Sequence, residues 1–275
     1  STGKAAVILP HGVLFRGNAE ETIRKSIVDK GWIKGIISLP PNLFYGTGIP
    51  ACILVIDKEG AENRQGIFMI NASRDYVKDG NKNRLREQDI YRIITTFNEQ
   101  IEDDPKYARF VPNQEIKIKN KYNLNITRYI DASDPEDIQN IDGHLNGGIP
   151  KDDIDGLQDY WKAFPELRKA LFKEVRPGFY SLKIAEDDIR QTIYSDKEYA
   201  AFGEQIDQAF SQWKDYAHPH LISVDDSLDA RYFIEDLSAR LIKEYEKFTL
   251  VNKYDVYQVL LAYWNEVMND DVLLI

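Results

Sequence analysis

The stretch from Lys4 to Lys58 constrains the fold of this chain more than any other part. It contains three apolar runs, each of a length typical of a buried strand. A helical pattern joins the first run to the second, and a loop rich in proline and glycine, residues 40–50, joins the second to the third. This order predicts an α/β sheet. A doubly wound sheet needs more strands than these, so we expect the stretch to be the back half of an enzyme domain. The three predicted strands are residues 4–9, 33–39 and 51–57.

Helix signals frame the segment between the first two predicted strands. Asn18 is a favourable N-cap residue, and Glu21 follows it at the spacing of a capping box. Residues 19–30 then carry apolar side chains on one face, and Gly31 ends the pattern. We therefore expect a helix that starts after Asn18.

The remainder of the chain divides by composition. A fourth strand is expected at residues 67–70, an amphipathic helix at 88–100, and a strand or extended arm at 110–121, where apolar and polar residues alternate. Paired glycines and a proline at Leu145–Pro150 mark a boundary. Beyond it, apolar residues recur at helical spacing, with a break expected at Pro165. The predicted organisation is residues 1–100 as the sheet domain, 101–150 as a connecting segment and 151–275 as a helical domain.

The charge of the chain is distributed unevenly. Residues 1–150 carry 20 basic and 20 acidic side chains, whereas residues 151–275 carry 15 and 25, so the second half accounts for the net charge of −10. An acidic surface is poorly suited to contact phosphates. Any contact with DNA is therefore expected in the first half, and contacts with protein or solvent in the second.

Several features predict a cytoplasmic protein that does not enter a membrane. The longest apolar runs are far too short to span a bilayer, and the first residues lack the order of a signal peptide. The single cysteine, Cys52, lies in an apolar strand pattern. We interpret it as a buried structural thiol, with a nucleophile as the alternative. A chain with one cysteine forms no internal disulfide.

The usual motifs of cofactor and metal sites are absent from the sequence. No glycine-rich loop follows a strand, and there is no P-loop, no HExxH and no pair of CxxC motifs. His218 and His220 could share a metal ion, but two histidines without a nearby cysteine are more typical of a solvated loop. No metal site is therefore predicted.

Two loops that follow strands are candidates for binding. Open α/β sheets place ligands beyond the carboxyl ends of their strands. Arg16, in the loop Pro10–Gly17, could contact a phosphate. Phe44 and Tyr45, in the loop Pro40–Pro50, could stack on a base. The alternative for Phe44 is that it covers the core.

A basic set follows the fourth predicted strand. Its members could contact DNA phosphates, or they could simply face solvent. The set comprises Arg74, Lys78, Lys82, Arg84 and Arg86.

These segments together resemble a known family. The motifs are PHGVLFRG at residues 10–17, LPPNLFYGTGIP at 39–50, NLNITRYIDAS at 123–133 and GGIP at 147–150. They are similar to the modification (M) subunit of type I restriction-modification systems, an adenine-N6 DNA methyltransferase. The resemblance covers nearly the whole chain, in order. It implies that this chain is a C-terminal fragment of such a subunit.

The resemblance also implies what the fragment lacks. The fold would be the C-terminal part of a Rossmann-like sheet that uses S-adenosylmethionine, followed by a mainly α-helical domain. The family's glycine-rich cofactor loop and its Asn-Pro-Pro-aromatic tetrad would lie upstream of residue 10. The sequence Pro40-Pro41-Asn42 is not that tetrad, because its order is reversed. No catalytic residue, bound cofactor or activity is therefore expected in this chain alone.

The resemblance further assigns roles and partners. Phe44 would pack against a flipped adenine, with DNA, the specificity (S) subunit and the restriction (R) subunit as partners. The helical half would dock on those subunits. Two alternatives remain open: a non-catalytic interaction module on an α/β scaffold, and an unrelated α/β nucleotide-binding protein. The missing phosphate loop argues against the second.

Overall fold

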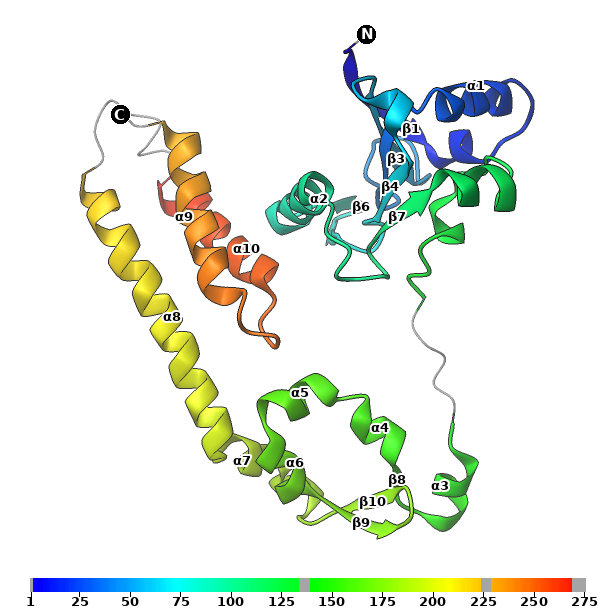
Figure 1. Ribbon diagram of the computed structural model, residues 1–275. Helices are drawn as coiled ribbons and strands as arrows, with labels where there is room; N and C mark the ends of the chain where they lie inside the picture. The colour runs from blue at the N-terminus through cyan, green and yellow to red at the C-terminus, as the bar shows by residue number, and fades with distance from the viewer. Residues whose placement is uncertain (1, 134–138, 224–228, 269–275) are drawn as a thin grey trace. The chain divides into compact units, whose positions relative to one another are not determined.

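The computed structural model describes residues 2–133, 139–223 and 229–268, and it divides the chain into two compact units. The first unit covers residues 1–135 and the second covers residues 136–275. The division falls inside the segment 101–150 that the sequence analysis assigns as connecting. Each unit is described by itself below (Figure 1).

Unit 1 is built on a five-stranded sheet in the order β1-β3-β2-β4-β7. β3 runs antiparallel to both β1 and β2, so β1 and β2 point in the same direction. β4 is parallel to β2, and β7 is antiparallel to β4. The first four predicted strands are confirmed with small changes at their ends, and the fifth strand, β7, overlaps only the start of the segment expected at residues 110–121. Their bounds are β1 (Lys4–Pro10), β2 (Ile33–Ser38), β3 (Ala51–Asp57), β4 (Gly66–Asn71) and β7 (Ala108–Pro112).

Both faces of the central strands are buried, which explains why these strands read as continuous apolar runs. Neighbouring residues enter different cores because side chains alternate along a strand. Ile67 and Met69 of β4 join the core beneath α1 (Asn18–Asp29), while Phe68 and Ile70 join the core beneath α2 (Glu87–Glu99). Figure 1 shows α1 and α2 on opposite sides of the strands. The result is a layered α/β arrangement.

The segment after β7 differs from the predicted strand at residues 110–121. The strand ends at Pro112, and Glu115–Lys119 form a single wide helical turn (η3). Ile116 is buried in the core, whereas Ile118 is 72% exposed. The alternating apolar residues of this segment therefore do not mark a strand. They lie in a helical turn that buries only one of the two isoleucines.

The start of α1 also differs from the prediction. Gly17 is the N-cap residue and Asn18 is the first residue of the helix, so the Asn18 side chain does not cap it. The end is as expected, because Gly31 has a φ of +63°. A Cβ atom at Gly31 would lie 2.1 Å from the carbonyl oxygen of Ala61, so only glycine fits that turn.

Unit 2 is mainly helical, as predicted, but it also contains a small sheet. α8 (Lys197–Ile222), α9 (Ala230–Tyr245) and α10 (Lys253–Tyr263) pack around one apolar cluster, and α8, α9 and the turn η6 (Trp264–Met268) pack around a second. Trp213 of α8 contributes to both clusters. Pro165 begins α6, which confirms the expected break. The shorter helices are α3 (Ile141–Asn146), α4 (Lys151–Asp155), α5 (Gln158–Ala163), α6 (Pro165–Leu171) and α7 (Ile189–Tyr194).

The sheet of unit 2 was not expected from the helical pattern. Its strand order is β8 (Ile149–Pro150), β10 (Phe179–Leu182) and β9 (Phe172–Arg176). Gly178 takes a φ of +77° in the turn between β9 and β10. Pro177-Gly178 between two short runs of aromatic and β-branched residues is the signal that predicts such a hairpin.

One buried cation ties unit 1 together. Arg24 is 6% exposed, and its guanidinium donates to the carbonyl oxygens of Tyr122 (2.8 Å), Val13 (2.9 Å) and Arg16 (2.9 Å). It thereby joins α1 to the loop after β1 and to the segment that follows η3. A buried charge is tolerated where every contact is a hydrogen bond of this kind.

Replacing Arg24 by methionine should lower the free energy of unfolding of unit 1 by about 3 kcal/mol, because three carbonyl groups lose a charged donor. The measurement is equilibrium unfolding in urea, followed by far-UV circular dichroism. Arg16→Met, a largely exposed arginine eight residues earlier, is the matched control and should change stability by less than about 0.5 kcal/mol. Equal effects of the two substitutions would contradict the role given to Arg24.

Candidate functional site

The two candidate loops meet at one edge of the unit 1 sheet. β1 ends at Pro10 and β2 ends at Ser38, and both strands point toward this edge. β3 begins there, at Ala51, because it runs in the opposite direction. The loop of residues 39–50, here called the aromatic loop, therefore leaves and re-enters the sheet at the same edge. This is the edge at which open α/β sheets bind ligands.

A small hairpin supports the aromatic loop. β5 (Val77–Asp79) and β6 (Lys82–Arg84) pair in antiparallel fashion. Asn83 of β6 is buried; its backbone N–H donates to the carbonyl of Asn42 (3.0 Å) and its side-chain amide donates to that of Pro41 (2.7 Å). Lys82 Nζ donates to the carbonyl of Phe44 (2.6 Å). The hairpin thus holds the backbone of the aromatic loop at three points.

Phe44 is accessible but not free of neighbours. The residue is 39% exposed, and it lines two apolar hollows. The smaller, about 180 Å³, lies between the end of β1 and the aromatic loop and includes Ile8 and Ile49. The larger, about 440 Å³, extends to Ile90 and Ile94 of α2. Phe44 therefore covers apolar surface and is also partly exposed at this edge of the sheet.

Tyr45 projects away from the protein. It is 94% exposed, and Lys82 Nζ lies 5.6 Å from the centroid of its ring. An aromatic ring beside a cation is a combination that suits a nucleobase or a phosphate. The same lysine therefore contacts the loop backbone and the exposed ring.

The predicted phosphate-binding residues lie in different settings. Arg16 is largely exposed, and its guanidinium is 3.8 Å from the carboxylate of Glu20. Arg84 is exposed beside Asp79, at 3.2 Å. Arg74 and Lys78 are also exposed, with Lys78 on β5 of the supporting hairpin.

Arg86 has a structural task that the sequence analysis did not foresee. Its backbone N–H and its guanidinium both donate to the buried carboxylate of Asp89, at 2.8 to 3.0 Å, and so close the first turn of α2. This differs from the other basic residues of the set. The sequence signal for this contact is Asp89, an acidic residue at the third position of α2, where it can form a capping box with the N-cap residue.

Two further residues at this edge were not singled out from the sequence as parts of the site. The side chain of His11, in the turn η1 (His11–Leu14), lies 3.0 Å from the hydroxyl of Ser38 through its Nε2 atom. Burial lowers the pKa of His11, with a hydrogen bond to the backbone of Ala51 acting in the opposite sense. An isolated histidine in a sequence carries no signal for such a contact, because Ser38 is distant along the chain.

Cys52 is fully buried in β3, which confirms that it is a structural thiol. Burial raises its pKa to about 11. A thiol with that pKa is almost wholly protonated at neutral pH, and the thiolate is the nucleophilic form. Burial and a raised pKa both argue against the nucleophile alternative.

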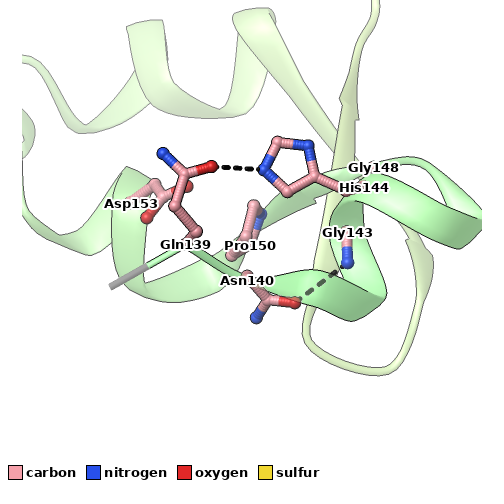
Figure 2. Close-up of a pocket in the computed structure, with 7 residues that line it drawn as sticks. All are labelled: Gln139, Asn140, Gly143, His144, Gly148, Pro150 and Asp153. Carbon is pink, nitrogen blue, oxygen red and sulfur yellow. Dashed lines mark hydrogen bonds between the residues drawn. The ribbon is translucent and has the colours of Figure 1, made fainter. Parts of the chain in front are cut away.

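Unit 2 contains two hollows of opposite character. A polar pocket of about 270 Å³ lies between α3, β8 and α4, and its side chains include His144, which is 2.7 Å from Gln139 (Figure 2). Asn140, in the same pocket, accepts a hydrogen bond from the backbone of Gly143 and caps α3. The second hollow, about 410 Å³, is almost entirely apolar and lies among α5, α6, α7 and the start of α8.

Neither pocket forms a metal centre. Within residues 2–133, 139–223 and 229–268, no three His, Cys, Asp or Glu side chains are grouped closely enough to bind a metal ion. His220, which the sequence analysis weighed with His218, instead lies 2.8 Å from the carbonyl of Tyr216 on α8. Over the same described residues, no helix has the length and apolar character needed to cross a membrane.

The comparisons with known proteins agree on one family. Residues 1–138, about half of the chain, match the model of the N-6 DNA Methylase family. The MjaVIII methylase subunit of a type I restriction enzyme from Methanocaldococcus jannaschii is 40% identical over 131 residues, which is 46% of this chain and 22% of that protein. The MpnII methylase subunit from Mycoplasma pneumoniae is 29% identical over 182 residues, covering 66% of this chain and 32% of that protein. This chain therefore spans between a fifth and a third of the length of these relatives.

A solved structure is similar as well. The methyltransferase subunit of a type I restriction-modification system from Streptococcus thermophilus is 40% identical, with a TM-score of 0.43. The match covers 47% of this chain and 27% of that chain.

The assignment of Cys52 as inert can be tested by alkylation. In the folded protein at pH 8, iodoacetamide should leave Cys52 unmodified over a time in which the urea-unfolded chain reacts completely, as measured by mass spectrometry. Because its pKa is about 11, the thiolate fraction should also rise about tenfold for each pH unit up to that value. Rapid modification of the folded protein at pH 8 would show that Cys52 is accessible and reactive.

Proposed function

This chain belongs to the N-6 DNA Methylase family, and we propose that it is the C-terminal part of the modification subunit of a type I restriction-modification system. The whole subunit would transfer a methyl group from S-adenosylmethionine to N6 of adenine in DNA. This chain would supply the later strands of a Rossmann-like sheet, an aromatic residue for the target base and helices for assembly. The cytoplasm, where bacterial and archaeal DNA is found, would be its location.

The observation that carries the proposal is the placement of Phe44. A base that is to be methylated must leave the DNA stack, and enzymes of this kind bind it against aromatic side chains. Phe44 offers a partly exposed ring at the carboxyl end of two parallel-running strands, on a loop whose backbone is held by the hairpin β5–β6. The pre-ordered backbone lowers the cost of presenting the ring.

Basic side chains near this loop support contact with DNA. Lys82 and Arg84 lie on the supporting hairpin, and Arg16 lies in the neighbouring loop after β1. Phosphate contacts position DNA without reading its sequence. We assign this role to Arg16, Arg74, Lys78, Lys82 and Arg84, of which Lys82 alone is half-buried, and leave Arg86 to the cap of α2.

The two hollows beside Phe44 do not suit S-adenosylmethionine. The two hollows beside Phe44 are lined by apolar side chains with Thr47, Asn83 and Arg84 as the polar exceptions, and neither contains a carboxylate that could hold ribose hydroxyl groups. The sequence also has no glycine-rich loop after a strand. The cofactor and the catalytic tetrad would therefore be held by the rest of the subunit.

The helical part of unit 2 suits contacts with other subunits. α9 and α10 expose large apolar side chains, among them Tyr232, Val259 and Tyr263. Where such side chains form a continuous patch, the patch is typical of a surface that binds a partner. We propose the specificity and restriction subunits as the partners, reached through this acidic half of the chain.

A second candidate function is a non-catalytic interaction module. It is favoured by the same exposed helices, and under it the α/β unit would serve only as a scaffold. The two functions differ in what they require of Phe44.

Replacing Phe44 by alanine in the full-length subunit, assembled with its partners, should lower the methylation rate by roughly tenfold to a hundredfold, because a stacked base is worth about 1–3 kcal/mol. The measurement is transfer of a tritiated methyl group to DNA. Phe44→Leu is the matched control: it preserves the apolar cover over the hollows but removes the aromatic face, so it should lose nearly as much activity. Full activity in Phe44→Leu would assign Phe44 to packing. Unchanged methylation in Phe44→Ala with weakened assembly would favour the interaction module.

The chain by itself should not bind S-adenosylmethionine. Isothermal titration calorimetry of residues 1–275 should give no saturable heat, whereas the full-length subunit under the same conditions should bind one equivalent. Stoichiometric binding at micromolar concentration by the chain alone would overturn the assignment of the cofactor site to the rest of the subunit.

A further inference from the structure

His11 lies outside the aromatic loop but contacts residues at both of its ends. It is the first residue after β1, and its backbone N–H donates to the carbonyl of Pro50, the last residue of the loop, at 3.2 Å. Its Nε2 atom lies 3.0 Å from the hydroxyl of Ser38, the residue immediately before the loop. Together the backbone and the ring of His11 therefore contact the residue before the loop and the last residue in it.

The register of the sheet brings these residues together. Pro10 pairs with Ala51, and Cys52 pairs with Leu9 on one side and with Ser38 on the other. One residue beyond β1 is therefore level with both ends of the loop. The N–H of Leu39 also donates to the carbonyl of Ala51 (2.9 Å), which closes the base of the loop.

The chemistry of the ring suits this position. Ser38 is almost fully buried, and an unpaired hydroxyl there would cost free energy. A neutral imidazole has one donor and one acceptor nitrogen, so it can accept from the Ser38 hydroxyl while the other nitrogen donates. Burial of the ring, which lowers the pKa of His11, favours this neutral form at pH 7.

We propose that His11 is a positioning residue, which fixes the two ends of the aromatic loop through the Ser38 hydroxyl and the Pro50 carbonyl and so sets the place of Phe44. This inference rests on the proposed function for its consequence in methylation. The geometry of the clamp is independent of that function. The two can therefore be tested apart.

The first experiment measures the loop itself in residues 1–275. Hydrogen–deuterium exchange of peptides covering residues 39–50 should become roughly tenfold faster in His11→Ala and in Ser38→Ala, because each removes the same hydrogen bond. His11→Gln, whose amide can reach the Ser38 hydroxyl, should restore slow exchange. His144→Ala, which removes a histidine hydrogen bond in unit 2, is the matched control and should leave this loop unchanged.

Unchanged exchange of the loop in Ser38→Ala would overturn the proposal, even if His11→Ala destabilised the whole of unit 1. Faster exchange throughout unit 1 in Ser38→Ala, without a greater effect in the loop, would also overturn it. Faster exchange confined to the loop and reversed by His11→Gln would support it.

The second experiment uses the full-length subunit with its partners. His11→Ala and Ser38→Ala should each lower kcat for methylation by roughly tenfold, with KM for DNA within about twofold of wild type, because the loss falls on orientation at the reacting base. His11→Gln should recover most of the activity. Unchanged kcat in Ser38→Ala, in a subunit that depends on Phe44, would overturn the role of His11 in positioning. If Phe44→Ala is itself fully active, the proposed function fails, and the exchange data still decide whether His11 holds the loop.

Discussion

The pairing of β3 with two strands that run the same way is the constraint from which the architecture of unit 1 follows. β3 is inserted between β1 and β2 and antiparallel to both. The chain must therefore leave β2 and return into β3 at one edge of the sheet, beside the end of β1. The aromatic loop is the connection that this topology demands. Its position beyond the carboxyl ends of β1 and β2 is therefore a result of strand order.

The sheet of unit 1 was largely predictable, because a strand that is buried on both faces appears in the sequence as a continuous apolar run. Strands such as IKGIIS and GIFMIN are continuous apolar runs, and they lie where the sequence places them. The strand or extended arm expected at residues 110–121, from alternating apolar residues, is present only as far as Pro112. Ile116 packs into the core through a helical turn, and the exposed Ile118 shows that alternation over so few residues is weak evidence.

The candidate site was predictable only in part, because its supporting contacts are distant along the chain. The aromatic pair and the exposed arginines stand out in the sequence by residue type. Asn83 does not, although two of its hydrogen bonds hold the aromatic loop. Arg86 has the same residue type as its exposed neighbours, but a carboxylate three residues later binds its side chain. Residue type identifies the candidates for a binding role. The fold shows which of these side chains are already held by other residues of the chain.

β1 lies at the edge of its sheet, and this has a consequence for work with the protein in solution. Its residues are mostly exposed, including Val7 and Ile8, and Lys4 is its single charged residue. An apolar edge strand with so little charge offers unpaired backbone groups to a strand of another molecule. Association of this chain with itself through β1 would then be a property of an uncovered sheet edge. It should be distinguished from any assembly that the helices of unit 2 direct.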